Sequence, residues 1–113
     1  MSLISTHILD TSRGLPASGV HVRLEHLSPD GTWAAMARGV TDADGRVDSL
    51  LYSDVALEDG DYRVVFSTGD YFRVIGVAAF YPEVVVHVRL EAGGRYHLPL
   101  LLSPFGYSTY RGS

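Results

Sequence analysis

The alternation of apolar and polar side chains constrains this chain more than any other feature. Residues 20–25 alternate between Val or Leu and a polar side chain, and residues 84–91 repeat the alternation over a longer run. A period of two places every second side chain on the same face of a β-strand, so that one face can meet a core while the other meets solvent. The sequence therefore predicts half-buried strands in both regions.

Turn-forming sequences separate further strand-like runs. The runs cover residues 4–10, 32–41, 46–51, 62–67 and 97–103. The last run could resume at residues 107–110. Turns rich in Gly, Asp and Pro fall at residues 28–31, 42–45, 58–61 and 93–94. Short strands at this spacing are typical of a β-sandwich or barrel, and 113 residues suit one domain, which we expect to span residues 1–113.

One segment departs from the strand pattern. Ser67 to Asp70 match the Ser-x-x-acid form of a capping box at a helix N-terminus, and Gly76 could end the helix that follows. We therefore expect one short helix, of about two turns, near residues 68–75.

The composition excludes several kinds of chemistry. There is no Cys and no Lys, which rules out thiolate nucleophiles, zinc–thiolate sites, Schiff-base chemistry and the phosphate-binding lysine of a P-loop. The formal net charge of −4 argues against nucleic acid and anionic membrane surfaces as partners. No apolar run reaches the roughly 18 residues of a membrane helix, and residues 1–5 do not resemble a signal peptide. We expect a soluble protein of the cytoplasm.

The C-terminal region differs in charge from the rest of the chain. All thirteen acidic residues lie between Asp10 and Glu91, whereas residues 92–113 contain two Arg, one His and no acid. An electropositive region suits a small anion or developing negative charge, although a strand that lacks acids by chance would look the same. Because two Tyr and an Arg follow an apolar strand here, we expect the terminus to be held against the domain.

Five His residues are candidates for proton transfer near neutral pH. His21, His26 and His87 lie beside charged residues and are interpreted as surface residues. His7 lies on a face that is neither clearly core nor clearly exposed, and His97 opens the most apolar strand. For both of these, the alternative is a hydrogen-bonded structural role. The spacing of the His residues gives little support to a metal site, and we expect none.

The length bears on where a ligand could bind. By area scaling, a folded monomer of this mass buries about two thirds of its surface, which suffices for a core but leaves little material for a deep pocket. A site within one subunit would therefore be shallow, and a site shared between subunits is the natural alternative.

Several motifs together resemble a known family. They are Ile4-Ser5-Thr6-His7-Ile8-Leu9-Asp10 with Gly14-Leu15-Pro16-Ala17, Thr41-Asp42-Ala43-Asp44-Gly45-Arg46, Phe80-Tyr81-Pro82-Glu83, His97-Leu98-Pro99-Leu100-Leu101-Leu102-Ser103-Pro104, and Tyr110-Arg111-Gly112-Ser113. From about residue 5 to the last residue, the chain is similar to the transthyretin-related 5-hydroxyisourate hydrolases. The terminal Tyr-Arg-Gly-Ser is the specific part of the match, because it separates these hydrolases from hormone carriers of the same fold.

The resemblance implies a fold, an assembly and a reaction. The fold is an all-β, transthyretin-like sandwich of two four-stranded sheets with one short helix, and the assembly is a homotetramer with its sites at the subunit interface. The implied reaction is the hydrolysis of 5-hydroxyisourate, an unstable product of urate oxidation, to 2-oxo-4-hydroxy-4-carboxy-5-ureidoimidazoline. The resemblance implies no cofactor.

Carried over position by position, the resemblance implies catalytic roles for His7, Arg46 and His97. It implies that substrate is bound by His7, Arg46, Tyr110, Arg111, Gly112 and Ser113. We expect one His to act as the base toward water and the other as the acid toward the leaving nitrogen. The planar fork of Arg46 would hold ring oxygens of the substrate. The sequence leaves open which His is the base.

Two other functions compete with this interpretation. A transthyretin-like module could bind a small aromatic ligand in a tetramer channel, although the polar set of His7, Arg46 and His97 argues against a hormone site. A Ser-His-Asp hydrolase is less favoured, because the sequence has no Gly-x-Ser-x-Gly elbow to place a nucleophile.

Overall fold

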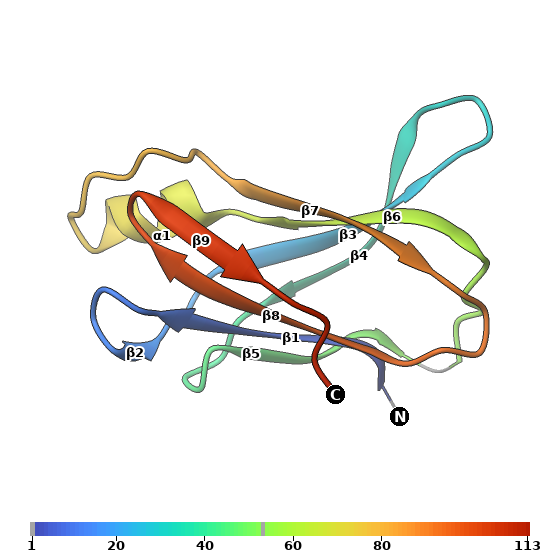
Figure 1. The fold of residues 1–113 in the computed structure, drawn as a ribbon, viewed down its shortest axis with the longest axis horizontal. Coiled ribbons are helices and arrows are strands. Elements are labelled where there is room, and N and C mark those ends of the chain that lie inside the picture. Colours follow the sequence, from blue (N-terminus) through green and yellow to red (C-terminus); the bar gives the residue numbers. More distant parts are fainter. Residues whose placement is uncertain (1, 53) are drawn as a thin grey trace.

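Two β-sheets packed face to face, with one short helix at an end, make up the computed structural model, which describes residues 2–52 and 54–113 (Figure 1). The first sheet contains β1 (Ser2–Asp10), β2 (Leu15–Pro16), β5 (Arg46–Tyr52), β8 (Tyr96–Ser103) and β9 (Gly106–Thr109). The second has the order β4-β3-β6-β7 and contains β3 (His21–Leu27), β4 (Trp33–Val40), β6 (Gly60–Phe66) and β7 (Val84–Leu90). The strand pattern predicted a sandwich or a barrel, and the structure confirms the all-β sandwich that the family resemblance implied.

The first sheet is four strands wide although five strands contribute to it. Its order is β2-β1-β8-β9, and β5 also pairs with β1. β5 lies along one edge of β1 over residues 2–7, and β2 lies along the same edge at Leu9 and Asp10. The opposite edge of β1 pairs in parallel with β8 over residues 4–10. The two-residue β2 was not among the predicted strands. β1 is thus flanked on both sides, which places its side chains at the middle of the sheet.

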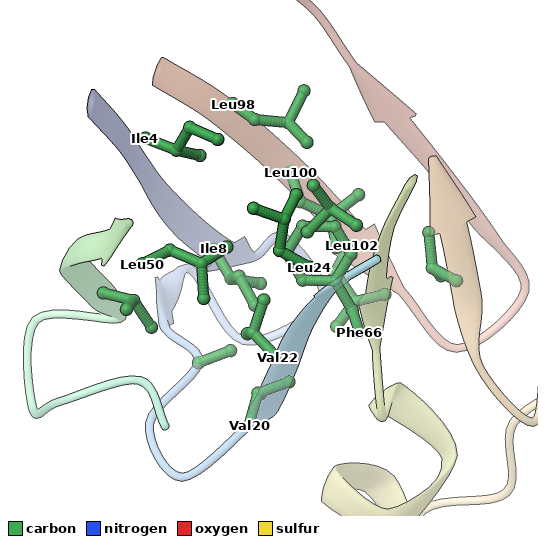
Figure 2. Close-up of a cluster of buried hydrophobic side chains, with 14 of the residues drawn as sticks. Ile4, Ile8, Val20, Val22, Leu24, Leu50, Phe66, Leu98, Leu100 and Leu102 are labelled. Atoms are coloured by element: carbon green, nitrogen blue, oxygen red, sulfur yellow. The ribbon is translucent and has the colours of Figure 1, made fainter. Parts of the chain in front are cut away.

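The core between the sheets accounts for the alternation in the sequence. Buried side chains of the first sheet meet those of the second in one cluster, which includes Ile4, Ile8, Val22, Leu24, Phe66, Leu98, Leu100 and Leu102 (Figure 2). On β1, the side chains between Ile4 and Ile8 alternate, and His7 is half-buried on the face away from this core. One face of β1 therefore belongs to the core, and the other is free to carry a functional site.

The helix α1 spans Thr68–Val74, close to its predicted place. The capping box predicted at its start is wrong, because the side chain of Ser67 makes no capping hydrogen bond. Asp70 instead pairs with Arg73 at 2.6 Å, one turn further along the helix. Gly76, with φ of +75°, ends the helix as expected. Within residues 2–52 and 54–113, no helix is long and apolar enough to cross a membrane.

Candidate active site

The pairing of β1 with its two neighbours brings three predicted site residues onto one face. His7 is the direct partner of Arg46 across the antiparallel β1 and β5 pair. Ser5, two residues before His7 and on the same face, is the direct partner of His97 across the parallel β1 and β8 pair. Directly paired residues in a sheet project to the same side. The structure therefore brings His7, Arg46 and His97 together on the outer face of the first sheet.

The surroundings of His97 shift its pKa. Its imidazole is half-buried, and its Nδ1 lies 2.8 Å from Ser5 Oγ. Burial lowers the pKa of His97 below its ordinary value, because the charged form loses hydration, and the positive charges of Arg46 and His7 lower it further. The carboxylate of Asp48 acts in the opposite direction. The balance favours a neutral imidazole at neutral pH, which is the form that can accept a proton.

The C-terminal segment lies against His97. The backbone N–H of Gly112 donates a 2.8 Å hydrogen bond to the carbonyl oxygen of His97. The guanidinium carbon of Arg111 sits 4.8 Å from the ring centre of Tyr96, in cation–π geometry. Thr109 Oγ1 donates to the carbonyl oxygen of Pro99 at 2.6 Å. The terminus is held against the domain, as expected from its composition.

Gly112 touches the imidazole itself. A Cβ built on Gly112 would lie 2.6 Å from His97 Cδ2 and 3.1 Å from the His97 carbonyl oxygen. Real Cβ atoms do not approach other atoms so closely, so only glycine allows the terminal segment to lie this near to His97. The side chains of Tyr110, Arg111 and Ser113 remain exposed in this chain.

A cavity of about 370 Å³ opens beside His97, between β7 and the start of β8. Tyr96, His97, Tyr110 and Arg111 line it together with apolar and charged or polar residues of β7. His7 and Arg46 do not line this cavity and lie instead on the open face of the sheet. Of the three residues of the cluster, only His97 therefore borders this cavity.

Two residues of the site were not assigned a role from the sequence. Ser5 holds the ring of His97, and Asp48 places a negative charge near it. Ser5 shares a face with His7 by simple alternation, but its contact with His97 depends on the parallel pairing of β1 with β8. Among residues 2–52 and 54–113, no three His, Asp or Glu side chains are grouped so that they could hold a metal ion.

Comparison with known proteins shows which family the chain is similar to. The model of the HIUase/Transthyretin family matches residues 4–112. The 5-hydroxyisourate hydrolase of Salmonella dublin is 46% identical over 113 residues, covering 99% of this chain and 82% of the relative. The structure of Klebsiella pneumoniae 5-hydroxyisourate hydrolase superimposes with a TM-score of 0.85 at 38% identity, covering 99% and 100% of the two chains. Sea bream transthyretin in complex with thyroxine superimposes with a TM-score of 0.91 at 35% identity, covering 97% and 94%.

Proposed function

The chain belongs to the HIUase/transthyretin family, and we propose that within this family it hydrolyses 5-hydroxyisourate. The observation that carries the proposal is the cluster of His7, Arg46 and His97 on the outer face of the first sheet. Two imidazoles and a guanidinium supply groups for proton transfer and for binding an oxyanion, which a carrier of an apolar ligand does not need.

The names of the substrate and product define the bond that is cleaved. The product carries a new carboxyl group and a ureido group, so water must add to a ring carbonyl carbon that is bonded to a ureide nitrogen. The water oxygen bonds to this carbon while its proton passes to one His, and the carbonyl π-electrons move onto the oxygen. The carbon–nitrogen bond then breaks, and the leaving nitrogen takes a proton from the other His.

Each member of the cluster has a role in this scheme. His7 and His97 supply the base and the acid, and Arg46 donates to the oxygens of the substrate through a planar fork. Tyr110 and Arg111 border the cavity beside His97 and are proposed to contact the substrate, with Gly112 and Ser113 completing the same terminal segment.

The proposed function is tested by the decay of freshly generated 5-hydroxyisourate, followed by ultraviolet absorbance. The wild-type protein should accelerate the decay. His7→Ala, Arg46→Ala and His97→Ala should each lower kcat/KM by about 100-fold or more, because each removes a proton-transfer group or an oxyanion donor.

The exposed His21, on the other sheet, provides the matched control, and His21→Ala should keep wild-type activity. A wild-type protein that leaves the spontaneous decay rate unchanged would overturn the enzyme proposal. Near-normal activity in one of the three site variants would remove only that residue from the mechanism.

Thyroxine binding and the decay rate, measured on the same protein, distinguish a small-ligand carrier from a hydrolase. A carrier should bind thyroxine, the ligand of the sea bream structure, without changing the decay rate. The hydrolase should accelerate the decay whether or not it binds thyroxine.

We also propose that the protein is a homotetramer whose sites are covered by a second copy. The open position of His7 and Arg46 supports this, since a neighbouring subunit would exclude water from them. Exposed aromatic side chains near the β9 edge support it as well, because Phe80 and Phe105 are each 72% exposed. The cytoplasmic location expected from the sequence stays a prediction, which fractionation of cells that express the protein would test.

A further inference from the structure

Ser5 makes the hydrogen bond that holds the side chain of His97. Its Oγ lies 2.8 Å from His97 Nδ1, and the two residues are direct neighbours across β1 and β8. In the part of the chain that the structure describes, no other group hydrogen-bonds to a ring nitrogen of His97. The orientation of this imidazole therefore depends on one hydroxyl group.

Gly112 closes the opposite side of the ring. Its backbone is packed against His97 Cδ2, where an added Cβ would approach to 2.6 Å. Nδ1 and Cδ2 are the two ring atoms bonded to Cγ, so contacts at both restrict rotation of the ring. Nε2 and Cε1 form the far edge of the ring, away from the Ser5 contact at Nδ1 and the Gly112 contact at Cδ2.

The role of Ser5 depends on which of its two neutral tautomers His97 adopts. A neutral imidazole carries its proton on one nitrogen and a lone pair on the other. Ser5 Oγ can accept a hydrogen bond from a protonated Nδ1 or donate one to an unprotonated Nδ1. Only the tautomer with its proton on Nδ1 leaves a basic lone pair on Nε2, and in that tautomer Ser5 Oγ is the acceptor.

We propose that Ser5 is a positioning residue for the hydrolysis, because its Oγ accepts the Nδ1–H of His97 and so keeps the basic lone pair on Nε2. The inference rests on the proposed function and assigns the base role to His97. The attacking water gives its proton to Nε2 of His97 as its oxygen bonds to the carbonyl carbon. His7 then supplies the proton for the leaving nitrogen.

The first test needs no substrate. In protein labelled with ¹⁵N at histidine, long-range ¹H–¹⁵N spectra at neutral pH should show His97 with a protonated Nδ1 and an unprotonated Nε2. The Ser5→Ala protein should show a mixture of the two tautomers, and Ser5→Thr, which keeps the hydroxyl group, should return to the wild-type pattern. Because this readout is independent of turnover, it stands even if the protein fails to hydrolyse 5-hydroxyisourate.

The second test separates positioning from binding by kinetics. Ser5→Ala should lower kcat by about 10-fold with little change in KM, a smaller loss than the removal of a base itself. Ser5→Thr should recover most of the wild-type kcat. The matched control is Ser18→Ala, at an exposed loop position, which should leave both constants unchanged.

Three results would overturn the proposal. The first is a wild-type His97 with its proton on Nε2, which can be observed whether or not any variant folds. The second is a Ser5→Ala protein with an unchanged kcat. The third is a Ser5→Thr protein whose kcat is as low as that of Ser5→Ala, since the hydroxyl group would then have no role.

Discussion

At the scale of single residues, the charges around His97 decide when it can act as a base. His7 acts on it from β1, Arg46 and Asp48 act on it from β5, and Arg111 stacks on the neighbouring Tyr96. Burial is the largest cause of the lowered pKa of His97, followed by the positive charges of Arg46 and His7. The neutral imidazole thus persists to lower pH than that of an ordinary His.

The contributions of the two charged neighbours can be separated by mutation. Arg46→Gln removes a positive charge and should raise the pKa of His97 toward its ordinary value of 6.5, whereas Asp48→Asn removes a negative charge and should lower it further. Titration of the His97 ring protons by NMR measures both shifts. Arg38→Gln, at an exposed position on the other sheet, should leave the titration unchanged.

The direction of the pH dependence of catalysis follows from the same pKa. If His97 is the base, kcat/KM should fall as the pH falls through its lowered pKa, so the wild-type enzyme should remain active at pH values below 6.5. A His97 titration above 6.5 in the wild-type protein, or shifts of the same sign in Arg46→Gln and Asp48→Asn, would contradict this account of the site.

At the scale of the elements, short-range patterns predicted the strands but not their partners. Alternation identified residues 20–25 and 84–91 as strands, because half-burial requires an apolar side chain at every second position of a strand. The parallel pairing of β1 with β8 joins Ser5 to a residue 92 positions away, and no local pattern encodes it. The resemblance supplied His97 as a site residue, whereas the contact that orients it came only from the structure.

The capping box is a local motif that is present in the sequence but does not form in the structure. Ser67 and Asp70 have the right spacing, but the exposed Asp70 pairs with Arg73, and the backbone of Ser67 does not take the conformation in which its side chain could cap the helix. Gly76 was predicted correctly, because a positive φ depends on the residue itself rather than on its neighbours.

The terminal segment is an element whose loss should affect catalysis more than stability. It is held to the domain by the Gly112 to His97 hydrogen bond and by the stacking of Arg111 on Tyr96. Deletion of residues 110–113 should therefore lower Tm by less than about 10 °C while reducing kcat/KM by at least about 10-fold. Thermal unfolding and the decay of 5-hydroxyisourate measure the two effects.

Adding one methyl group at Gly112 tests the role of the terminal segment without deleting it. Gly112→Ala should push the terminal segment away from His97 and reduce kcat/KM in the same direction as the deletion. In the matched control Gly106→Ala, the added Cβ would meet no atom closer than 3.7 Å, and activity should be retained. Full activity in the deleted protein would show that the segment has no part in the reaction.

At the scale of the whole molecule, the sandwich leaves its edge strands and its functional face uncovered. β7 and β9 end their sheets in the strand order, and unpaired strand edges readily pair with other chains. The rings of Tyr81 and Tyr107 meet at 5.2 Å beside the exposed Phe80, so that apolar surface gathers near one edge. Both features support the proposed assembly of identical subunits.

Sedimentation tests the assembly directly. The wild-type protein should sediment as a particle of about 49 kDa, four times the 12.3 kDa of one chain. Phe80→Asp places a charge on the exposed aromatic surface and should give smaller particles with reduced activity. Val74→Asp, at an 83% exposed position on α1, is the matched control and should leave the assembly intact. A monomeric wild-type protein with full activity would contradict a shared site.

The parallel contact between β1 and β8 also has a consequence for biosynthesis. His7 leaves the ribosome well before His97 and Gly112, and the reactive cluster requires all of them. Pairing across so long a stretch of chain is slow to form, because the loop between the strands must be closed first. A nascent chain should therefore be inactive until β8 and Gly112 have emerged from the ribosome, so that the onset of activity reports the pairing of β8 with β1.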